Sequence, residues 1–163
     1  MISRATAEDL PAILRLQRQA FRGEAERVGD MNIKPMAQTL DELREEFEGS
    51  VFLKYVQDGE ILGSVRGRME GEVCHIGRLV VRPDRWRQGI GRELIDGIER
   101  TFAQAARFEL FTRIDHERTR PFYRSLGYEP YRSERYSDTL TFVHLFKPGH
   151  GPAVGGSRDE LKG

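Results

Sequence analysis

The stretch RWRQGIGRELI, residues 85 to 95, holds three arginines and two glycines at the predicted start of a helix. The first backbone N–H groups of a helix have no helical acceptor and carry a partial positive charge, so they can bind an anion. Gly89 and Gly91 let the backbone turn sharply and approach a bulky phosphate, while Arg87 and Arg92 can add charge-assisted hydrogen bonds. The pattern indicates a diphosphate site; the alternative is a tight turn with solvated arginines.

The glycine spacing at this corner differs from the common nucleotide-binding motifs. Leu94 stands at the third glycine position of G-x-G-x-x-G, and the chain lacks the Gly-Lys-Ser/Thr of a Walker loop. An anion site must also be local, because 26 basic residues balance 26 acidic ones and no global field attracts nucleic acid or a membrane. We therefore expect neither nucleic acid nor a membrane as a partner.

Cysteine and histidine usage sets the expected compartment and metal content. The only cysteine, Cys74, cannot form an internal disulfide and is expected to be a small buried side chain. The N-terminus has neither an apolar signal core nor a run long enough to span a bilayer, so we expect a cytoplasmic protein. The histidines are scattered without metal-ligand spacing, and no metal is expected: His75, His116, His144 and His150.

The first part of the chain predicts a short strand and two helices. Residues 1 to 21 indicate a strand and then a helix that begins at a capping box headed by Thr6. The apolar stripe of this helix comprises Leu10, Ile13, Leu14 and Phe21. Residues 22 to 36 have no period and are expected to form a loop before a second helix capped by Thr39. The carboxylates of that loop either attract a cationic amine or are simply solvated: Glu24, Glu26 and Asp30.

The middle of the chain predicts a hairpin and a crossover between parallel strands. Residues 51 to 69 alternate apolar and polar side chains on both sides of Asp58-Gly59, which is typical of a tight hairpin. Residues 72 to 81 form a further β-run that Pro83 interrupts, the glycine corner opens a helix, and residues 107 to 113 return to β character. A strand, a helix and a strand in this order imply a right-handed parallel crossover.

The end of the chain predicts a short helix, two strands and a tail. Residues 119 to 126 indicate a helix that Gly127 stops, and residues 128 to 147 indicate a last pair of strands. The tail, residues 148 to 163, has almost nothing to bury and is expected to be disordered. We expect one domain over residues 1 to 147.

Two segments carry a resemblance to a known family. The stretches IGRLVVRPDRWRQGIGRELI and FELFTRIDHERTRPFYRSLGYE resemble the GNAT superfamily of acetyl-CoA-dependent N-acetyltransferases, and the likeness covers residues 2 to 147. QGIG matches the pyrophosphate loop of that family, and FYRSLGY matches its later helix signature. Trp86 departs from the family, which has Gln or Arg at that position of the loop. The resemblance implies a mixed α/β fold with a largely antiparallel sheet, one splayed parallel strand pair and helices on both faces.

The resemblance also implies where acetyl-CoA binds. Its pantetheine would enter between the strand ending at Val81 and the strand 108 to 112, and a backbone N–H near Leu79 or Val80 would stabilise the oxyanion. The implied cofactor contacts are Leu79, Val80, Val81, Arg87, Gln88, Gly89, Ile90, Gly91, Arg92 and Thr119. The roles of Arg82 and Arg85 stay open between contact with the ribose phosphate of the coenzyme and surface charge paired with Asp84.

Two residues are candidates for proton transfer, because an amine that attacks a thioester must lose a proton and the departing thiolate must gain one. Tyr123 matches the tyrosine that protonates the thiolate in many family members; the alternative is that it only packs beside Phe122. His75 occupies the place where some relatives carry a glutamate base, and ordered water could serve instead. Glu72 and Asp115 are weaker candidates for the base.

The activity expected from the resemblance is acetyl transfer to a primary amine. Its acceptor would be a small molecule or a peptide, and a homodimer is possible because family members often pair through their C-terminal strands. One alternative is a catalytically silent module that binds acetyl-CoA as a sensor. Another is a nucleotide-binding regulator that uses the same glycine turn and binds ATP or NAD.

Overall fold

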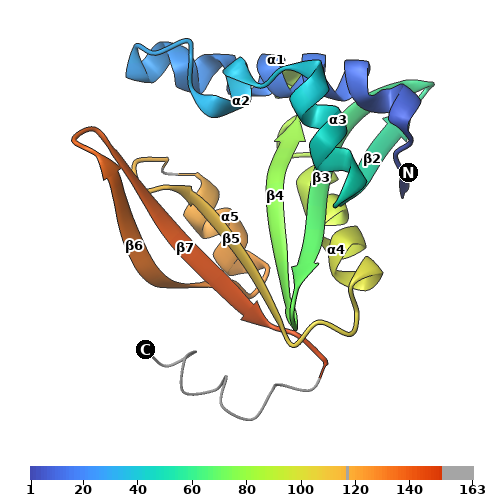
Figure 1. The fold of residues 1–163 in the computed structure, drawn as a ribbon, viewed down its shortest axis with the longest axis vertical. Helices are drawn as coiled ribbons and strands as arrows, with labels where there is room; N and C mark the ends of the chain where they lie inside the picture. Colours follow the sequence, from blue (N-terminus) through green and yellow to red (C-terminus); the bar gives the residue numbers. More distant parts are fainter. Residues whose placement is uncertain (117, 152–163) are drawn as a thin grey trace. The chain divides into compact units, whose positions relative to one another are not determined.

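The computed structural model describes residues 1–116 and 118–151, and this part of the chain forms a mixed α/β fold (Figure 1). Within it, seven strands form one sheet in the order β1-β2-β3-β4-β5-β7-β6. The strands are β1 (Ile2–Arg4), β2 (Val51–Gln57), β3 (Glu60–Glu70), β4 (Val73–Val81), β5 (Arg107–Arg113), β6 (Glu129–Ser137) and β7 (Leu140–Pro148). The helices are α1 (Leu10–Val28), α2 (Lys34–Ala37), α3 (Leu40–Glu48), α4 (Ile90–Thr101) and α5 (Thr119–Ser125). Short 3-10 turns lie at Ala7–Asp9 and Pro83–Arg85.

The sheet is mainly antiparallel. β1 pairs with β2, β2 with β3, β5 with β7 and β6 with β7 in antiparallel registers. β4 and β5 are parallel, and the helix α4 lies between them in the sequence. A parallel pair needs such a crossover, because a tight hairpin can only join antiparallel strands. The predicted fold class and the predicted parallel strand pair are therefore confirmed, whereas the right-handed sense of the crossover stays a prediction.

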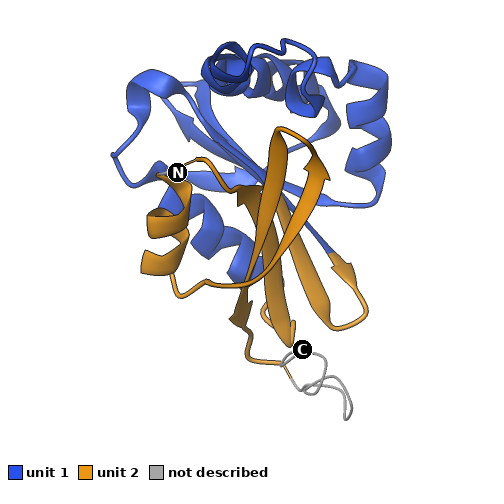
Figure 2. Ribbon diagram, turned by 90° about the vertical axis from the view of Figure 1, so that its left-hand side faces the viewer, with its two compact units in different colours: residues 1–68, 78–101 blue, residues 69–77, 102–163 orange. Residues whose placement is uncertain are grey.

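The described residues separate into two compact units (Figure 2). The first unit comprises Met1–Arg68 and Arg78–Thr101. The second comprises Met69–Gly77 and the chain from Phe102 onward. Strand β4 contributes residues to both units, and the division falls inside that strand. The expected single domain over residues 1–147 stays a prediction.

Helix α1 is longer than the sequence predicted. It runs from Leu10 to Val28, so the prediction of a loop over residues 22–36 was wrong for its first seven positions, and α2 forms within the rest. Gly23 lies in the helix interior, where a glycine costs about 1 kcal/mol relative to alanine without breaking the helix. The helix ends only at Gly29, whose φ of 74° gives the left-handed conformation of a C-cap.

The local signals at the other ends of elements are confirmed. A capping box joins Thr6 and Asp9 ahead of α1. In the box of α3, the amide of Glu42 donates to the hydroxyl of Thr39 at 3.1 Å, and the amide of Thr39 donates to the carboxylate of Glu42 at 2.9 Å. The hairpin between β2 and β3 turns at Asp58-Gly59, with φ of 52° and 77°. Positive φ at both central residues matches the twist of the flanking strands.

The first unit has helices on both faces of its strands. On one face, residues of α1 and α3 pack against Phe52 of β2, and the core there comprises Ala5, Leu10, Ile13, Leu14, Leu43 and Phe52. On the other face α4 lies close to Gly63 of β3, and its stripe of Leu94, Ile95 and Ile98 is fully buried. The alternation of strand side chains therefore supplies one apolar face to each helix layer. This arrangement places the start of α4, and the turn before it, at the end of β4.

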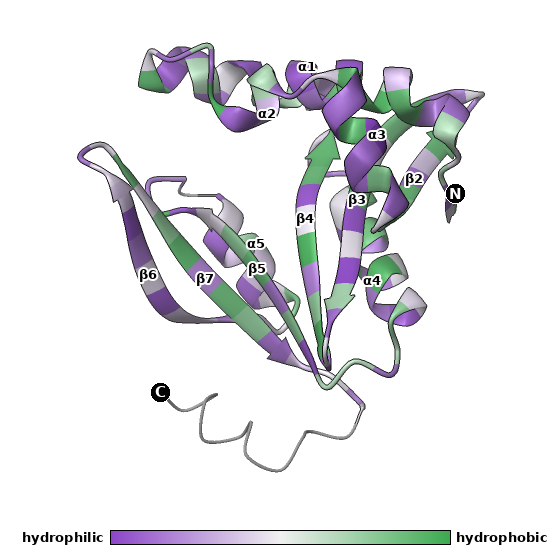
Figure 3. Cartoon of the chain, in the orientation of Figure 1, coloured by the Kyte–Doolittle hydropathy of each residue, from purple (hydrophilic) through white to green (hydrophobic). Residues whose placement is uncertain are grey.

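The second unit is a sheet of β5, β7 and β6 with the first half of β4 beside it. β7 carries buried Val143 and Leu145, whereas β6 is exposed at nearly every position. Figure 3 shows β6 in hydrophilic colours next to the more hydrophobic β7. Charged side chains on an edge strand discourage pairing with other chains, which is how natural sheets protect their edges.

The first residues of the expected tail belong to the folded part. Strand β7 includes Pro148, and the amides of Gly149 and Gly151 donate to the carbonyls of Ala106 and Ala105, both at 2.9 Å. The remainder of the expected tail, residues 152–163, lies outside the described residues. None of the helices in residues 1–116 and 118–151 is long and apolar enough to cross a membrane.

We expect Gly63→Ala to destabilise the first unit, because the new Cβ would lie 2.9 Å from Leu94 Cδ1, 3.0 Å from Ile90 Cγ2 and 3.1 Å from the Val80 carbonyl oxygen. Overpacking of this kind typically costs about 1–3 kcal/mol of the free energy of unfolding, measurable in urea. Gly23→Ala is the matched control, since nothing lies within 4 Å of its Cβ and the helix should gain roughly 0.5–1 kcal/mol. Equal stability of Gly63→Ala and wild type would contradict the close approach of α4 to β3.

Candidate active site

The turn before α4 leads into the first amides of a helix. The amide of Glu93 donates to the carbonyl of Gly89 at 3.1 Å, which is the first hydrogen bond of the helix. The amides of Ile90, Gly91 and Arg92 precede that bond, so no helical carbonyl can accept from them. These are the groups that the sequence predicted as anion ligands, and the helix of twelve residues adds its dipole to their charge.

Two residues of the turn have left-handed backbone conformations. The φ of Arg87 is 68° and that of Gly89 is 85°. Arg87, Gln88 and Gly89 are all exposed, and no atom lies within 4 Å of a Cβ placed on Gly89. Alternating right-handed and left-handed residues direct successive amides to one side and form a concave anion site. The turn thus combines amide donors, open space and nearby guanidinium groups.

Trp86 holds this turn against the end of β4. Its indole Nε1–H donates to the carbonyl of Val81 at 2.9 Å, while 42% of the residue stays exposed. Val81 was predicted to contact the cofactor. The indole hydrogen bond already uses one lone pair of its carbonyl oxygen. The tryptophan that departs from the family loop therefore fixes the strand-to-turn connection with its side chain.

Arg82 is a surface ion pair. Its Nε lies 2.7 Å from Asp84 Oδ1, and its Nη1 lies 2.6 Å from Glu60 Oε2. These contacts confirm the surface alternative for Arg82, because both carboxylates engage its guanidinium fork. Arg85 is half-buried in the 3-10 turn that also contains Asp84.

Strand β4 has an irregular backbone where the oxyanion donors were predicted. The φ of Arg78 is 48°, a value that non-glycine residues in strands rarely adopt. Leu79 and Val80 follow directly, and Val80 is buried whereas Leu79 is half-buried. Sequence reasoning missed Arg78. The available signal was a Gly-Arg pair inside the otherwise apolar run IGRLVV.

His75 lies on the part of β4 that pairs with β5. The parallel register joins Val73–His75 with Arg107–Glu109 and stops there, although β5 continues to Arg113. The Nε2 atom of His75 lies 3.1 Å from Glu70 Oε1, and the side chain is 32% exposed. A histidine beside a carboxylate at the end of a ladder is accessible and oriented, as a proton acceptor requires.

Tyr123 is buried in the second unit. The residue is 9% exposed and packs edge-on against Phe122 and Tyr128, with ring centroids 5.0 and 6.0 Å away. Within residues 1–116 and 118–151 its hydroxyl makes no hydrogen bond. Burial raises the pKa of this phenol well above its ordinary value, so it carries its proton at neutral pH. A phenol that keeps its proton at neutral pH is the form that a general acid needs.

Tyr123 and His75 lie on opposite faces of the sheet of the second unit. The hydroxyls of Thr112 on β5 and Thr119 on α5 are 2.8 Å apart, so α5, which carries Tyr123, covers the Thr112 face. Glu109 is three residues before Thr112 and faces the other way, and His75 is its partner in the parallel ladder. Only a group lying in the plane of the sheet can therefore meet both side chains.

Thr119 was predicted to contact the cofactor, and its donor is already engaged. Its Oγ1 donates to the carbonyl of His116 at 3.1 Å, so Thr112 supplies the hydrogen in the bond between the two threonines. A hydroxyl has one hydrogen and two lone pairs, which leaves Thr119 able only to accept one further hydrogen bond.

The other residues considered in the sequence are a cysteine and two carboxylates. Cys74 is fully buried, which confirms the prediction of a small buried side chain. Asp115 lies 3.3 Å from Arg113 in an ion pair, and Glu72 is exposed. Residues 1–116 and 118–151 contain no group of three or more potential metal-ligating side chains.

The comparison with known proteins identifies the class. Residues 10–128 match the sequence profile of the Acetyltransferase (GNAT) family. This match spans most of the chain, and it includes both the turn before α4 and the helix that carries Tyr123. The protein belongs to the GNAT acetyltransferase family.

Solved structures share this fold. The ribosomal-protein-S18-alanine N-acetyltransferase from Escherichia coli has a TM-score of 0.77 at 20% identity, covering 94% of this chain and 96% of that chain. The PaiA N-acetyltransferase from Thermoplasma acidophilum in complex with coenzyme A has a TM-score of 0.73 at 16% identity, covering 91% and 98%. The phosphinothricin acetyltransferase from Sinorhizobium meliloti in complex with AcCoA has a TM-score of 0.75 at 15% identity, covering 95% and 91%.

The buried phenol predicts a specific pH behaviour. Because burial raises the pKa of Tyr123, folded wild type and folded Tyr123→Phe should gain the same phenolate absorbance up to about pH 11, whereas in urea wild type should gain one tyrosine more. The unfolded chain releases this proton above about pH 10 while the folded chain keeps it, so the free energy of unfolding falls with rising pH, and falls less steeply in Tyr123→Phe. Identical slopes would contradict the burial of an un-ionised phenol.

Proposed function

We propose that the protein transfers the acetyl group of acetyl-CoA directly to a primary amine. Membership of the GNAT family supports acetyl transfer, and coenzyme A or acetyl-CoA is bound in two of the similar structures. The observation that carries the proposal is the turn before α4, where left-handed Arg87 and Gly89 precede the helix, the space beside Gly89 is open, and the amides of Ile90–Arg92 have no helical acceptor. A diphosphate is the anion whose two charges and size match several amides together with exposed arginines.

The reaction needs three groups, and the chain offers a candidate for each. The amine nitrogen forms a bond to the thioester carbon, the C–S bond breaks, and the amine loses a proton while the thiolate gains one. A backbone N–H of Leu79 or Val80 stabilises the oxyanion, His75 or ordered water accepts the amine proton, and Tyr123 protonates the coenzyme A thiolate. His75 is assisted by Glu70, which stabilises the imidazolium as it forms.

The opposite placement of His75 and Tyr123 favours a thioester in the plane of the sheet. The ladder between β4 and β5 stops at His75 and Glu109, so backbone groups of β5 beyond that pair lack a partner of the parallel ladder. Pantetheine carries amides that can occupy such groups. In this position the attacking amine approaches from the His75 face and the thiolate departs toward Tyr123, which separates the two proton transfers in space.

The acceptor is proposed to be a small-molecule or peptide amine. One similar structure is named for acetylation of a ribosomal protein and another for acetylation of phosphinothricin, so the fold accommodates both kinds of acceptor. No metal takes part in the proposed chemistry, because a backbone N–H, Tyr123 and either His75 or ordered water fill the three roles. A cytoplasmic location and a homodimer through the C-terminal strands stay predictions.

The test of the proposal is a panel of amine acceptors with acetyl-CoA and a thiol-detecting dye. Release of free thiol that depends on both substrates supports acetyl transfer. Tight binding of acetyl-CoA without thiol release for any acceptor indicates a silent sensor instead. Binding of ATP or NAD in preference to coenzyme A indicates a nucleotide-binding regulator.

In that assay, Tyr123→Phe and His75→Gln should each lower kcat while the affinity for acetyl-CoA stays near that of wild type. General acid or base assistance is typically worth roughly 10² to 10⁴ in rate, and removal of the hydroxyl or imidazole removes it. Tyr136→Phe is the matched control, because that tyrosine is 60% exposed on β6. Unchanged kcat in Tyr123→Phe would remove the phenol from the mechanism. Unchanged kcat in His75→Gln would indicate that water accepts the amine proton.

Gly89→Ala should weaken coenzyme A binding measured by calorimetry. Its φ of 85° strains an alanine, and the new Cβ enters the open space in which the diphosphate would lie. A loss of roughly 10-fold in affinity corresponds to about 1.4 kcal/mol of strain or displaced contact. Gly71→Ala is the matched control, since its φ is also positive at 62° and its surroundings are also open, but it lies in the β3–β4 turn. Equal affinities of both variants and wild type would exclude the turn as the diphosphate site.

A further inference from the structure

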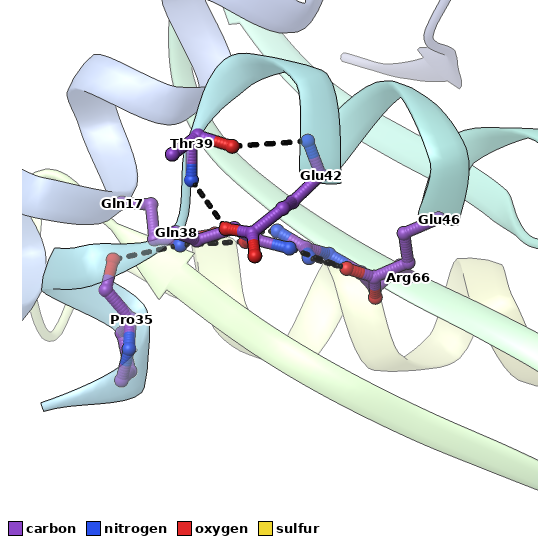
Figure 4. Close-up of polar contacts among 7 residues, drawn as sticks. All are labelled: Gln17, Pro35, Gln38, Thr39, Glu42, Glu46 and Arg66. Atoms are coloured by element: carbon purple, nitrogen blue, oxygen red, sulfur yellow. Dashed lines mark hydrogen bonds and ion pairs between the residues drawn. The ribbon is translucent and has the colours of Figure 1, made fainter.

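A polar network lies beneath α1 and α3 in the first unit (Figure 4). Its centre is Arg66 of β3, which is 3% exposed. The Nη1 group of Arg66 donates to Glu46 Oε1 at 2.7 Å, its Nη2 group donates to Gln17 Oε1, and its guanidinium lies 4.6 Å from the centroid of Phe52. A buried guanidinium is thus held by one carboxylate, one amide and one ring.

The side chains that accept hydrogen bonds from Arg66 make further hydrogen bonds within this network. Gln17 Nε2 donates to the Pro35 carbonyl at 2.8 Å and to Gln38 Oε1 at 3.0 Å. Gln38 Nε2 in turn donates to Glu46 Oε1 at 2.9 Å, so one carboxylate oxygen accepts from both Gln38 and Arg66 (Figure 4). The ring of hydrogen bonds fixes α1, α3 and β3 to one another.

Arg78 of β4 adds a second guanidinium to this region without a carboxylate of its own. It interacts electrostatically with Glu46 and Glu24, and it repels Arg66. In the part of the chain that the structure describes, Arg78 makes no hydrogen bond or ion pair, and its Nε is buried without an acceptor. Burial lowers the pKa of Arg78, and burial together with Arg78 lowers the pKa of Arg66 to about 10.

The region has more cationic donors than acceptors. Arg18 of α1 donates to the Gln38 carbonyl at 2.9 Å, and the Nε atoms of Arg18, Arg66 and Arg78 are all buried without a partner. Glu46 interacts with both Arg66 and Arg78, and Glu24 interacts with Arg78. A buried charge without a hydrogen-bonded partner is costly, and a bound anion would relieve that cost.

We propose that Arg78 binds a carboxylate of the acceptor, so that the acceptor is a primary amine that also carries a carboxylate. The inference rests on the proposed function, because it uses the position of Arg78 directly before the amides of Leu79 and Val80. The guanidinium fork fits a carboxylate in a bidentate manner. The left-handed backbone of Arg78 is the kind of local strain that persists at ligand sites. Arg78 is half-buried and remains accessible from solvent.

The test compares matched acceptors in wild type, Arg78→Met and Arg15→Met. One arm uses L-leucine and L-leucinamide, and the other uses the dipeptide amides Ala-Glu-NH2 and Ala-Gln-NH2, which separates an α-carboxylate from a side-chain carboxylate. Wild type should prefer the carboxylate in one arm, and Arg78→Met should lose roughly 10- to 100-fold of that preference in kcat/KM, mainly through KM. Arg15 is an exposed arginine of α1, and Arg15→Met should keep the preference. Thiol release without a preference in either arm, or a preference that Arg78→Met retains, overturns the inference while the proposed function stands.

A binding measurement separates the inference from the proposed function. In the ¹⁵N spectrum of full-length protein with acetyl-CoA, the Nε–H signal of Arg78 is identified by its loss in Arg78→Met, whose thermal unfolding confirms that it folds. Titration with the four acceptors should shift this signal only for those that carry a carboxylate, even if none releases thiol. Absence of a shift for both carboxylates, or equal shifts for acids and amides, overturns the inference.

Discussion

The parallel ladder between β4 and β5 contains three residue pairs, and the chemistry proposed for this protein depends on its early end. Beyond His75, β4 continues to Val81 and changes backbone conformation at Arg78. A regular ladder would use every backbone group of both strands for pairing, which leaves none for a ligand. The left-handed residue interrupts the regular strand backbone just before Leu79 and Val80, so the same strand carries the base candidate and the proposed oxyanion donor, and it leads to the proposed anion-binding turn.

Burial affects the protonation of the titratable side chains of this protein in two different ways. For Tyr123 it favours the neutral phenol, which is the form that can donate a proton to a thiolate. For Arg66 and Arg78 it opposes the charge that each must carry, and only hydrogen bonds and nearby carboxylates compensate. Arg66 donates such bonds to Glu46 and Gln17, whereas among the described residues the guanidinium of Arg78 relies on electrostatic attraction alone. This difference between the two arginines is the physical basis for assigning a ligand to the second.

The turn before α4 illustrates how a side chain that departs from a family pattern can still support the local backbone geometry. Trp86 cannot supply the polar side chain expected at its position, yet its indole bonds to the end of β4 and fixes where the turn begins. The amides of Ile90, Gly91 and Arg92 lack a helical acceptor because of the geometry of the helix start, which is independent of any side chain. Backbone donors of this kind tolerate sequence change, because only the left-handed residues beside them need to be retained.

The sequence alone determined most of the element order, the parallel strand pair and the glycine turn that opens α4, because helix caps, strand alternation and glycines at positive φ are local signals. It also singled out Tyr123 and His75. It missed the extension of α1 through Gly23, since a helix tolerates one glycine when packing supports it. Only the tertiary structure decided that Tyr123 and His75 lie on opposite faces, that Trp86 bonds Val81, and that Arg66 and Arg78 share one buried region. Those facts depend on residues distant in sequence, whose contacts no local pattern encodes.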